Sequence, residues 1–244
     1  MKQTMIKIKT DLHCHTIASS HAYSTVAELA CWAAKRELEA IAVTDHGTAI
    51  PDAPHPWHFE NLGILPKEID GVRILHGVEV NILDGQGAID MEEDLLKKMD
   101  IVVASIHTPC YREAAGGDHT GAYLGALAHK DVDILGHSGD PRFVYDYEQV
   151  VRRAKENHQL IEINAHTFRG RQASVPNSRR IAQWCKKLEA GIVVNSDAHI
   201  CYNVASFEPA LEMLSEIDFP EKLIMNRDLT VLRDYLAPRK KIEE

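Results

Sequence analysis

Short apolar runs recur along the chain at intervals of roughly 30 residues, the length of one strand–helix unit. They cover 6–10, 40–44, 72–75, 100–104, 132–135, 160–163 and 191–194, and β-branched residues are frequent in them. Several are almost continuously apolar, as parallel strands are when both faces of the sheet are covered. The pattern therefore predicts seven parallel strands joined by helices, with 222–225 as a short eighth strand.

The segments between these runs have helical composition. Thr25 and Glu28 have the spacing of a capping box, which predicts a helix from there to Glu39. Further helices are predicted over 90–99, 120–130, 147–157, 177–189, 207–217 and 228–236, with Asn177 as an N-cap. The alternation fits an open doubly wound sheet or a closed barrel, but no GxGxxG motif follows the first run.

Composition narrows the class of protein. With 45% hydrophobic and 26% charged residues, the chain of 244 residues is too apolar for a disordered protein. No apolar run approaches the roughly 18 residues of a membrane span, and a net charge of -9 argues against a nucleic-acid partner. Five cysteines without a CxxC pair, and a start without an apolar signal region, predict a cytoplasmic protein. Without an internal linker, residues 1–244 are expected to form one domain.

Histidine is the unusual component, with 14 copies, and many of them lie where a predicted strand ends. In a barrel, the carboxyl ends of the strands meet at one rim. Imidazole and carboxylate groups suit zinc and similar divalent ions, and one ion takes only about four to six ligands. The pattern therefore predicts a site for more than one metal. The strand-end candidates are His13, His15, His46, Glu79, His107, His137, His166, Asp197 and His199.

Other polar residues near these positions have simpler expected roles. Cys14 alternates with its histidine neighbours and is expected to be a small core residue. Asp11 and Asp45 are expected to support neighbouring imidazoles rather than to bind metal. His119 lies in a glycine-rich loop and is expected to be solvated. No metal role is assigned to three further histidines: His76, His129 and His158.

Taken together, these motifs resemble the PHP (polymerase and histidinol phosphatase) superfamily, from about residue 8 to residue 204. The segment 21–24, the loop 52–59 and the chain length are similar to the small stand-alone phosphatases of the YcdX type. The motifs that carry the resemblance are 11–16 with Ser19, 44–47, Glu79, His107, 136–137 and 195–199.

The resemblance implies a distorted (βα)7 TIM-like barrel with a trinuclear metal site at the C-terminal ends of its strands. Zinc is the first expectation for all three divalent ions, with manganese or iron as alternatives. The family pattern places Glu79 between two of the ions. The implied ligand sets are His13, His15, Glu79 and Asp197 for one ion, Glu79, His107 and His137 for the second, and His21, His46 and His199 for the third.

Such a site fits hydrolysis of a small phosphate monoester, because clustered cations attract the phosphoryl oxygens. The expected reaction is in-line attack by a metal-bound hydroxide, with Glu79 and Asp197 holding the ions. His58 and Arg169 are candidates for substrate contacts, on the loops after the second and sixth runs. The expected partner is a small phosphorylated metabolite, neither a membrane nor nucleic acid, and homo-oligomerisation is left open.

Four other functions share part of this pattern. A histidinol-phosphate phosphatase would use the same superfamily site, and assay against that ester would distinguish it. A 3'-5' exonuclease of the same superfamily would need a basic groove, which the charge does not favour. An amidohydrolase-like enzyme would leave His21, His46 and His199 unexplained, and a metal-storage protein would need closed coordination.

Overall fold

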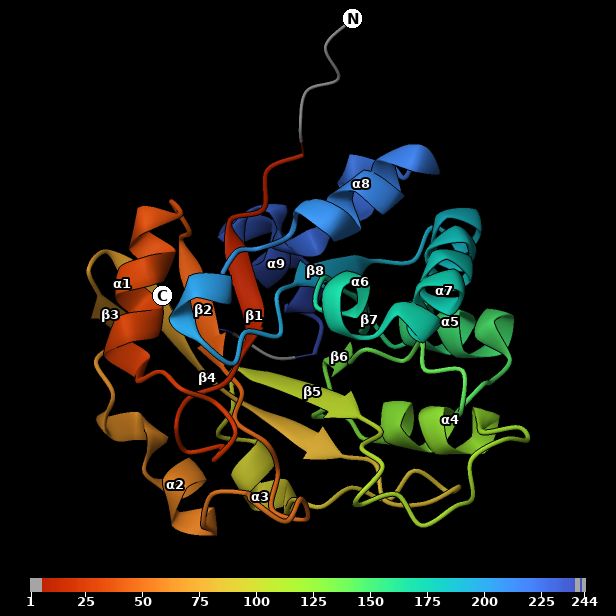
Figure 1. The fold of residues 1–244 in the computed structure, drawn as a ribbon, viewed down its shortest axis with the longest axis horizontal. Helices are drawn as coiled ribbons and strands as arrows, with labels where there is room; N and C mark the ends of the chain where they lie inside the picture. The colour runs from red at the N-terminus through yellow and green to blue at the C-terminus, as the bar shows by residue number, and fades with distance from the viewer. Residues whose placement is uncertain (1–5, 240–241, 243–244) are drawn as a thin grey trace, which may run out of the picture.

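Within the part of the chain that the structure describes, seven parallel strands form one sheet that is nearly closed into a barrel (Figure 1). The computed structural model describes residues 6–239 and 242. The strand order is β1-β2-β4-β5-β6-β7-β8, and β3 pairs antiparallel with β4. The strands are β1 (Thr10–Cys14), β2 (Ala40–Val43), β3 (Glu68–Ile69), β4 (Val72–Asn81), β5 (Ile101–Ser105), β6 (Ile134–Leu135), β7 (Leu160–Asn164) and β8 (Ile192–Asn195).

Helices pack outside the sheet (Figure 1). The capping box that the sequence predicts is present in α1, where Thr25 N donates to Glu28 Oε2 at 2.7 Å. The N-cap of α7 is Ser174 rather than Asn177, because the helix begins at Val175, two residues before Asn177. The helices are α1 (Val26–Lys35), α2 (Pro56–Glu60), α3 (Glu93–Leu96), α4 (Thr120–Ala128), α5 (Tyr147–Glu156), α6 (Thr167–Gly170), α7 (Val175–Leu188), α8 (Glu208–Glu216) and α9 (Leu229–Leu236).

Two strands differ from their predicted ranges, and both differences bring functional candidates into the sheet. The first strand begins at Thr10 rather than at residue 6, because its pairing with β2 starts at Thr10 and Ala40. The run 72–75 continues to Asn81, because β4 changes its neighbour from β2 to β5 at Gly77. Glu79 is consequently a residue of the sheet rather than of a loop.

The predicted eighth strand at 222–225 is wrong. The segment forms two 3-10 turns, Glu221–Leu223 and Met225–Arg227, and only Ile224 makes a bridge, to Ile192. Asn226 instead inserts its side chain between β1 and β8 and donates to the carbonyl oxygens of both strands. Side-chain hydrogen bonds therefore close the barrel at its N-terminal end, where the strands themselves do not form a ladder.

Two apolar clusters organise the fold. One lies between the strands and the outer helices and contains Leu29 of α1 and Val150 of α5. The other fills the barrel around Leu12, Leu75 and Ile101, and α9 packs against it. The interior beyond this second cluster, toward the C-terminal ends of the strands, is polar and buried.

None of the helices that the structure describes combines the length and apolar character needed to cross a membrane.

Candidate metal centre

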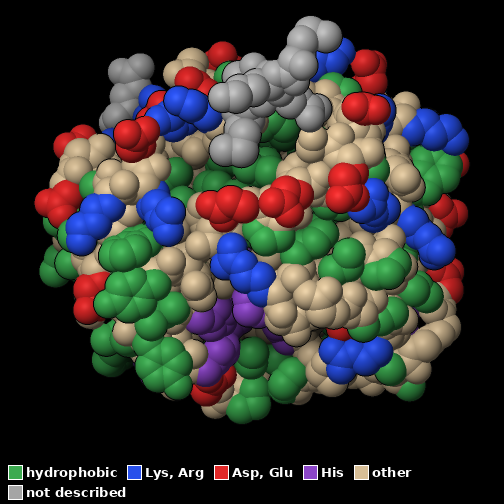
Figure 2. Space-filling model, turned by 45° about the horizontal axis from the view of Figure 1, so that its top comes forward, with side chains coloured by type: hydrophobic (Ala, Val, Ile, Leu, Met, Phe, Trp, Pro, Cys, Tyr) green, Lys and Arg blue, Asp and Glu red, His purple; other side chains and the backbone are tan. Residues whose placement is uncertain are grey.

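The C-terminal ends of the strands place a group of histidines and carboxylates in one hollow, and Figure 2 shows histidine side chains gathered there. We call this group the candidate metal centre. It unites His13 of β1 and Glu79 of β4 with residues of the loops that follow β1, β2, β5, β6 and β8. Its members are the nine predicted ligands: His13, His15, His21, His46, Glu79, His107, His137, Asp197 and His199.

Glu79 is the geometric middle of the candidate metal centre. It is fully buried on β4, and both of its carboxylate oxygens face imidazole nitrogens. Oε1 lies 3.2 Å from His13 Nε2 and 2.9 Å from His137 Nε2. Oε2 lies 2.8 Å from His46 Nδ1. One carboxylate therefore contacts imidazoles from three separate parts of the chain, as a residue shared between two ions must.

The potential ligand atoms form three sets. Within each set, all the atoms lie within 4.8 Å of one another, the separation expected of groups that surround one ion. Two of the sets share His15 and two share His46, so neighbouring positions overlap. These overlaps differ from the partition that the family resemblance implies, in which only Glu79 is shared. The three sets are His13, His15 and Asp197; His15, His46 and His199; and His46, Glu79 and His107.

His21 is the outermost member. Its side chain is 45% exposed, and its Nε2 lies 3.1 Å from the Nε2 atoms of both His46 and His199. On the other side, His21 Nδ1 is 2.6 Å from Asp52 Oδ2. Asp52 can therefore fix the orientation of the ring so that Nε2 points at the other two histidines.

Several buried nitrogen atoms of these histidines have no hydrogen-bond partner. They are His13 Nε2, both ring nitrogens of His15, His46 Nδ1 and His107 Nε2. A buried polar atom without a partner costs stability, and such atoms are uncommon outside functional sites. Four of them, one from each histidine, lie within 4 Å of Glu79 or Asp197 and are potential metal-binding atoms: His13 Nε2, His15 Nε2, His46 Nδ1 and His107 Nε2. The donor set therefore fits divalent ions of the zinc, manganese or iron type.

Electrostatics keep the carboxylates of the centre ionised. Burial by itself disfavours the charged form of Glu79, but His13, His107 and His46 outweigh that effect and hold its pKa well below the usual range. Burial opposes the charge of Asp197 in the same way, while His13 and Arg171 hold its pKa well below normal. Burial also lowers the pKa of His107 to about 3. The centre thus offers charged carboxylates and a neutral His107 imidazole, which suit metal binding. Burial opposes the charge of His13, but Glu162 and Glu79 outweigh that effect and hold the pKa of His13 well above its usual range.

The backbone at two of these residues is unusual. Asp197 has a φ angle of 53° and His137 one of 20°, in the left-handed region that glycine favours. Strained conformations of this kind persist where surrounding contacts hold them, commonly at functional sites. Here the contacts are hydrogen bonds that Ser196 N donates to Asp11 and that His137 N donates to Glu162.

Three polar residues that were not predicted from the sequence form hydrogen-bond contacts with expected metal ligands. Glu162 on β7 lies 2.8 Å from His13 Nδ1, and Asn81 Oδ1 lies 2.7 Å from His107 Nδ1. Asn164 Nδ2 donates to Asp197 Oδ2 at 3.2 Å. A signal for Glu162 existed, because it is a charged residue inside an otherwise apolar run.

The two predicted substrate contacts have protein partners. His58 Nε2 lies 3.0 Å from Asp45 Oδ2, and Arg169 Nη2 donates to the carbonyl oxygen of Ser206 at 2.6 Å. Arg171, two residues further on, points to the centre instead, with Nη2 3.2 Å from Asp197 Oδ2. Its Nη1 is buried and has no hydrogen-bond partner.

Arg171 also lines a cavity of about 580 Å³ that adjoins the centre. His107 and His137 form part of the same cavity wall. Apolar side chains, among them Ile106 and Phe143, complete it. The cavity therefore joins the expected metal ligands to a space of the size that small ligands occupy. His166, the weakest strand-end candidate, is half-buried, and none of the three ligand sets includes it.

The supporting roles expected for three residues need correction. His119 is buried rather than solvated, because its ring is held between the Tyr111 hydroxyl at 2.8 Å and the carbonyl oxygen of Gly116 at 3.0 Å. Asp11 accepts from backbone N–H groups rather than from an imidazole. Asp45 does contact an imidazole, but it belongs to His58 and not to an expected ligand.

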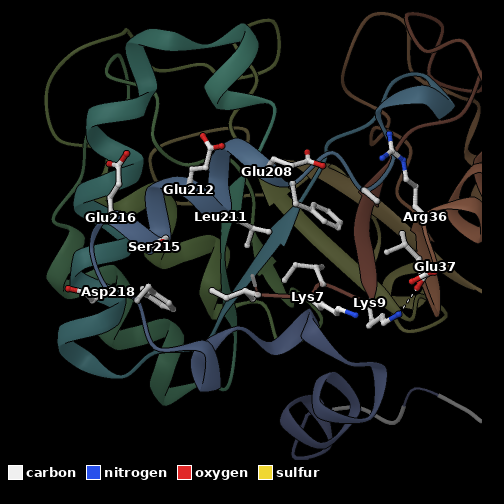
Figure 3. Close-up of a pocket in the computed structure, with 16 residues that line it drawn as sticks. Lys7, Lys9, Arg36, Glu37, Glu208, Leu211, Glu212, Ser215, Glu216 and Asp218 are labelled. Carbon is white, nitrogen blue, oxygen red and sulfur yellow. Dashed lines mark hydrogen bonds between the residues drawn. The ribbon is translucent and has the colours of Figure 1, made fainter. Parts of the chain in front are cut away.

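A larger cavity, of about 730 Å³, lies before the N-terminal ends of β1 and β2 (Figure 3). Glu208, Glu212 and Glu216 follow one face of α8 along it, and Lys7 and Lys9 lie on the opposite side. None of the described residues that line it is a histidine or a cysteine. The expected metal ligands His107 and His137 line the smaller cavity instead.

Comparison with known proteins agrees with this geometry. A model of the PHP domain matches residues 11–166. A probable phosphatase of Clostridium novyi is 42% identical over 240 residues and covers 98% of each chain. Another, of Acetivibrio thermocellus, is 43% identical over 235 residues, with 96% of this chain and 98% of the relative covered.

Among solved structures, histidinol phosphate phosphatase of Lactococcus lactis, in complex with zinc, L-histidinol and phosphate, has the same fold. Its TM-score is 0.60 at 18% identity, with 87% of this chain and 94% of that chain covered. The match of the domain model over more than half of the chain, and the identity to full-length relatives, settle the family. The chain belongs to the PHP domain family.

Proposed function

We propose that the chain is a single PHP-type domain, spanning residues 1–244, that acts as a metal-dependent phosphatase on a small phosphate monoester. Three divalent ions, zinc first, would occupy the candidate metal centre, and the protein would work in the cytoplasm. The relatives named probable phosphatases support the activity. The observation that carries the proposal is the set of buried, unpartnered imidazole nitrogens that converge on Glu79 and Asp197.

Bound divalent ions would supply a nucleophilic water at neutral pH and charge to balance the phosphoryl oxygens. The protein's own part is to hold the ligands at fixed separations before substrate arrives. Glu79 does so from the middle of the sheet, where backbone pairing with Val103 on β5 fixes its position. Asp197 is held by Arg171 and by Asn164. Such preorganisation is the main contribution of a protein to phosphoryl-transfer chemistry.

Arg171 is better placed than Arg169 to contact substrate. Its Nη2 contacts Asp197, and Arg171 lines the cavity together with His107 and His137. A guanidinium group is suited to phosphate because it presents several N–H donors in one plane. The cavity of about 580 Å³ would take the remainder of the ester, which restricts the substrate to a small metabolite.

The proposal is tested by phosphate release. Protein freed of metal with a chelator should release no phosphate from a chromogenic phosphomonoester or from a panel of metabolite esters. Addition of zinc or manganese should restore the release. Histidinol phosphate belongs in the panel because it separates the closest alternative activity from the others. Equal release with and without metal, or no release from any ester after metal addition, would contradict the proposal.

A further inference from the structure

Glu162 is a buried carboxylate at which contacts with three expected ligands meet, although it is not itself one of the nine. It lies on β7, and the loop that follows β7 supplies none of the nine ligands. Its side chain accepts four hydrogen bonds, and its residue is 4% exposed. The donors are His13 Nδ1 at 2.8 Å, His137 N at 2.8 Å, Asn195 Nδ2 at 2.9 Å and Asn164 Nδ2 at 3.0 Å.

These four contacts occupy the acceptor positions of both carboxylate oxygens of Glu162. Oε1 accepts from His13 and Asn195, and Oε2 accepts from His137 and Asn164. Two bonds to each oxygen use the acceptor capacity of an ionised carboxylate. Glu162 is therefore only an acceptor, and His13 must carry a proton on Nδ1. That leaves the opposite nitrogen, Nε2, to face Glu79 at 3.2 Å, where it has no hydrogen-bond partner.

The same carboxylate controls a second ligand through the backbone. The bond to His137 N holds this residue at a φ of 20°, and from there His137 Nε2 reaches Glu79 Oε1 at 2.9 Å. His13 and His137 thus approach one oxygen of Glu79 with their rings nearly parallel, at 20° and 5.9 Å between centroids. Their mutual position depends on Glu162, because it is the group that bonds to both.

A third ligand is reached through an intermediate residue. Asn164 donates one bond to Glu162 and another to Asp197 Oδ2. Asn195 joins Glu162 to β1, because its Oδ1 accepts from Leu12 N. These bonds span the seam between β8 and β1. Glu162 therefore lies at the centre of the polar network that fixes the inner side of the candidate metal centre.

We propose that Glu162 is a positioning residue that sets the separation of two metal positions, the one served by His13 and the one served by His137. This inference rests on the proposed function, because it takes the two histidines as ligands of different ions. It makes a specific demand on metal binding: the loss of Glu162 should weaken two ions together. The third position, at His21, His46 and His199, has no hydrogen bond to Glu162 and should keep its ion.

The test is a titration of the metal-free full-length protein with zinc in competition with a chromogenic chelator. Wild type should take up three ions. Glu162→Gln keeps the size of the side chain but replaces one acceptor oxygen with a donor, so two of the three affinities should fall by about 10- to 100-fold, as for other residues that orient metal ligands. Glu162→Asp keeps the charge but is too short to reach all four donors, and it should weaken the same two ions.

Asp133→Asn is the matched control. Asp133 is also a buried carboxylate, and it contacts Val102 N and Arg239, neither of which belongs to the candidate metal centre. This variant should bind three ions with wild-type affinities. Circular dichroism and thermal unfolding of all variants separate a local effect from a loss of fold.

The outcomes distinguish the inference from the proposed function. Unchanged affinities in folded Glu162→Gln and Glu162→Asp proteins would overturn the positioning role alone. Equal weakening of all three ions would also overturn it, because it would indicate a general structural effect. A wild type that takes up fewer than two ions would instead overturn the proposed function.

Discussion

The two ends of the barrel differ in whether their buried polar groups have hydrogen-bond partners. At the N-terminal end, the Asn226 side chain donates to the carbonyl oxygens of Thr10 and Val194 and accepts from Val194 N. At the C-terminal end, the ring nitrogens of His15 and the Nε2 atom of His13 are equally buried but have no partner. The first arrangement stabilises the closed barrel. The second costs stability in the absence of a ligand, and binding of a ligand to those atoms would offset that cost.

The two cavities also differ in the residues that line them. The one before β1 and β2 is larger, but carboxylates and lysines form its rim and it has no histidine among its described lining residues (Figure 3). The smaller one adjoins His107 and His137. The unpartnered imidazole nitrogens thus lie beside the smaller of the two cavities. The predictions below test this difference between the two ends.

The largest effect is expected for Glu79→Gln. The amide keeps the size of the side chain but removes the charge that faces His13, His46 and His137. Metal content should fall by at least one ion per chain, and phosphate release should fall by at least about 100-fold, since charge compensation at the ions is lost. Elemental analysis and a phosphate assay measure the two quantities. Full activity in this variant would exclude a bridging role for Glu79.

A smaller loss is expected for Arg171→Gln. Because its guanidinium group contacts Asp197 and lines the cavity, kcat/KM should fall by about 10- to 100-fold, the size of one charged hydrogen bond. Arg169→Gln is the matched control, because Arg169 already bonds to Ser206. It should change kcat/KM by less than about threefold. A larger fall in kcat/KM for Arg169→Gln than for Arg171→Gln would indicate that Arg169, and not Arg171, contacts the substrate.

Asn226→Ala tests the opposite end of the barrel. The change leaves Thr10 O, Val194 O and Val194 N without their side-chain partner, so the free energy of unfolding should fall by about 3 kcal/mol. Urea unfolding measures this loss. Metal content at a temperature where the variant is folded should equal that of wild type. A loss of bound ions from the folded variant would contradict the prediction, because it would show that metal binding at one end of the barrel depends on the hydrogen bonds at the other end.

The smallest effect is a dependence of stability on pH in the metal-free protein. Burial lowers the pKa of His107 to about 3, whereas an unfolded histidine titrates near 6.5. Between these values the unfolded chain binds a proton that the folded chain does not. The contribution of His107 to the free energy of unfolding should therefore decrease as the pH falls from about 6.5 toward 3, by up to about 1.4 kcal/mol per pH unit.

His107→Gln provides the comparison for this effect. The variant lacks the titrating group, so its stability relative to wild type should improve as the pH is lowered from about 7 to about 5. Urea unfolding in the presence of a chelator measures the difference at each pH. A difference that does not change with pH would show that His107 is not held neutral by burial.

Most of the fold could be predicted from the sequence, because parallel strands buried on both faces produce apolar runs at regular spacing. The beginning of β1 could not, because the β-branched residues of 6–10 suit a strand, but the pairing with β2 starts only at Thr10. The eighth strand failed for a related reason. Its composition suits a strand, but Asn226 pairs through its side chain and leaves the segment as two turns.

The candidate site was predictable to a similar degree. Position at strand ends identified eight of the nine histidines and carboxylates that the structure brings together, and the ninth, His21, came from the family resemblance. Residues that orient the ligands, such as Glu162 and Asn81, have no periodic signal, and only the charge of Glu162 within an apolar run distinguishes it in the sequence. Arg171 differs from Arg169 only in the direction that α6 and the following turn give its side chain. That direction depends on tertiary structure.

The most direct test of the central claim is elemental analysis of wild-type protein purified without chelator, with phosphate release measured on the same sample. The account predicts close to three divalent ions per chain, and phosphate release that disappears when they are removed and returns when they are restored. Fewer than two ions per chain in an active sample would contradict it.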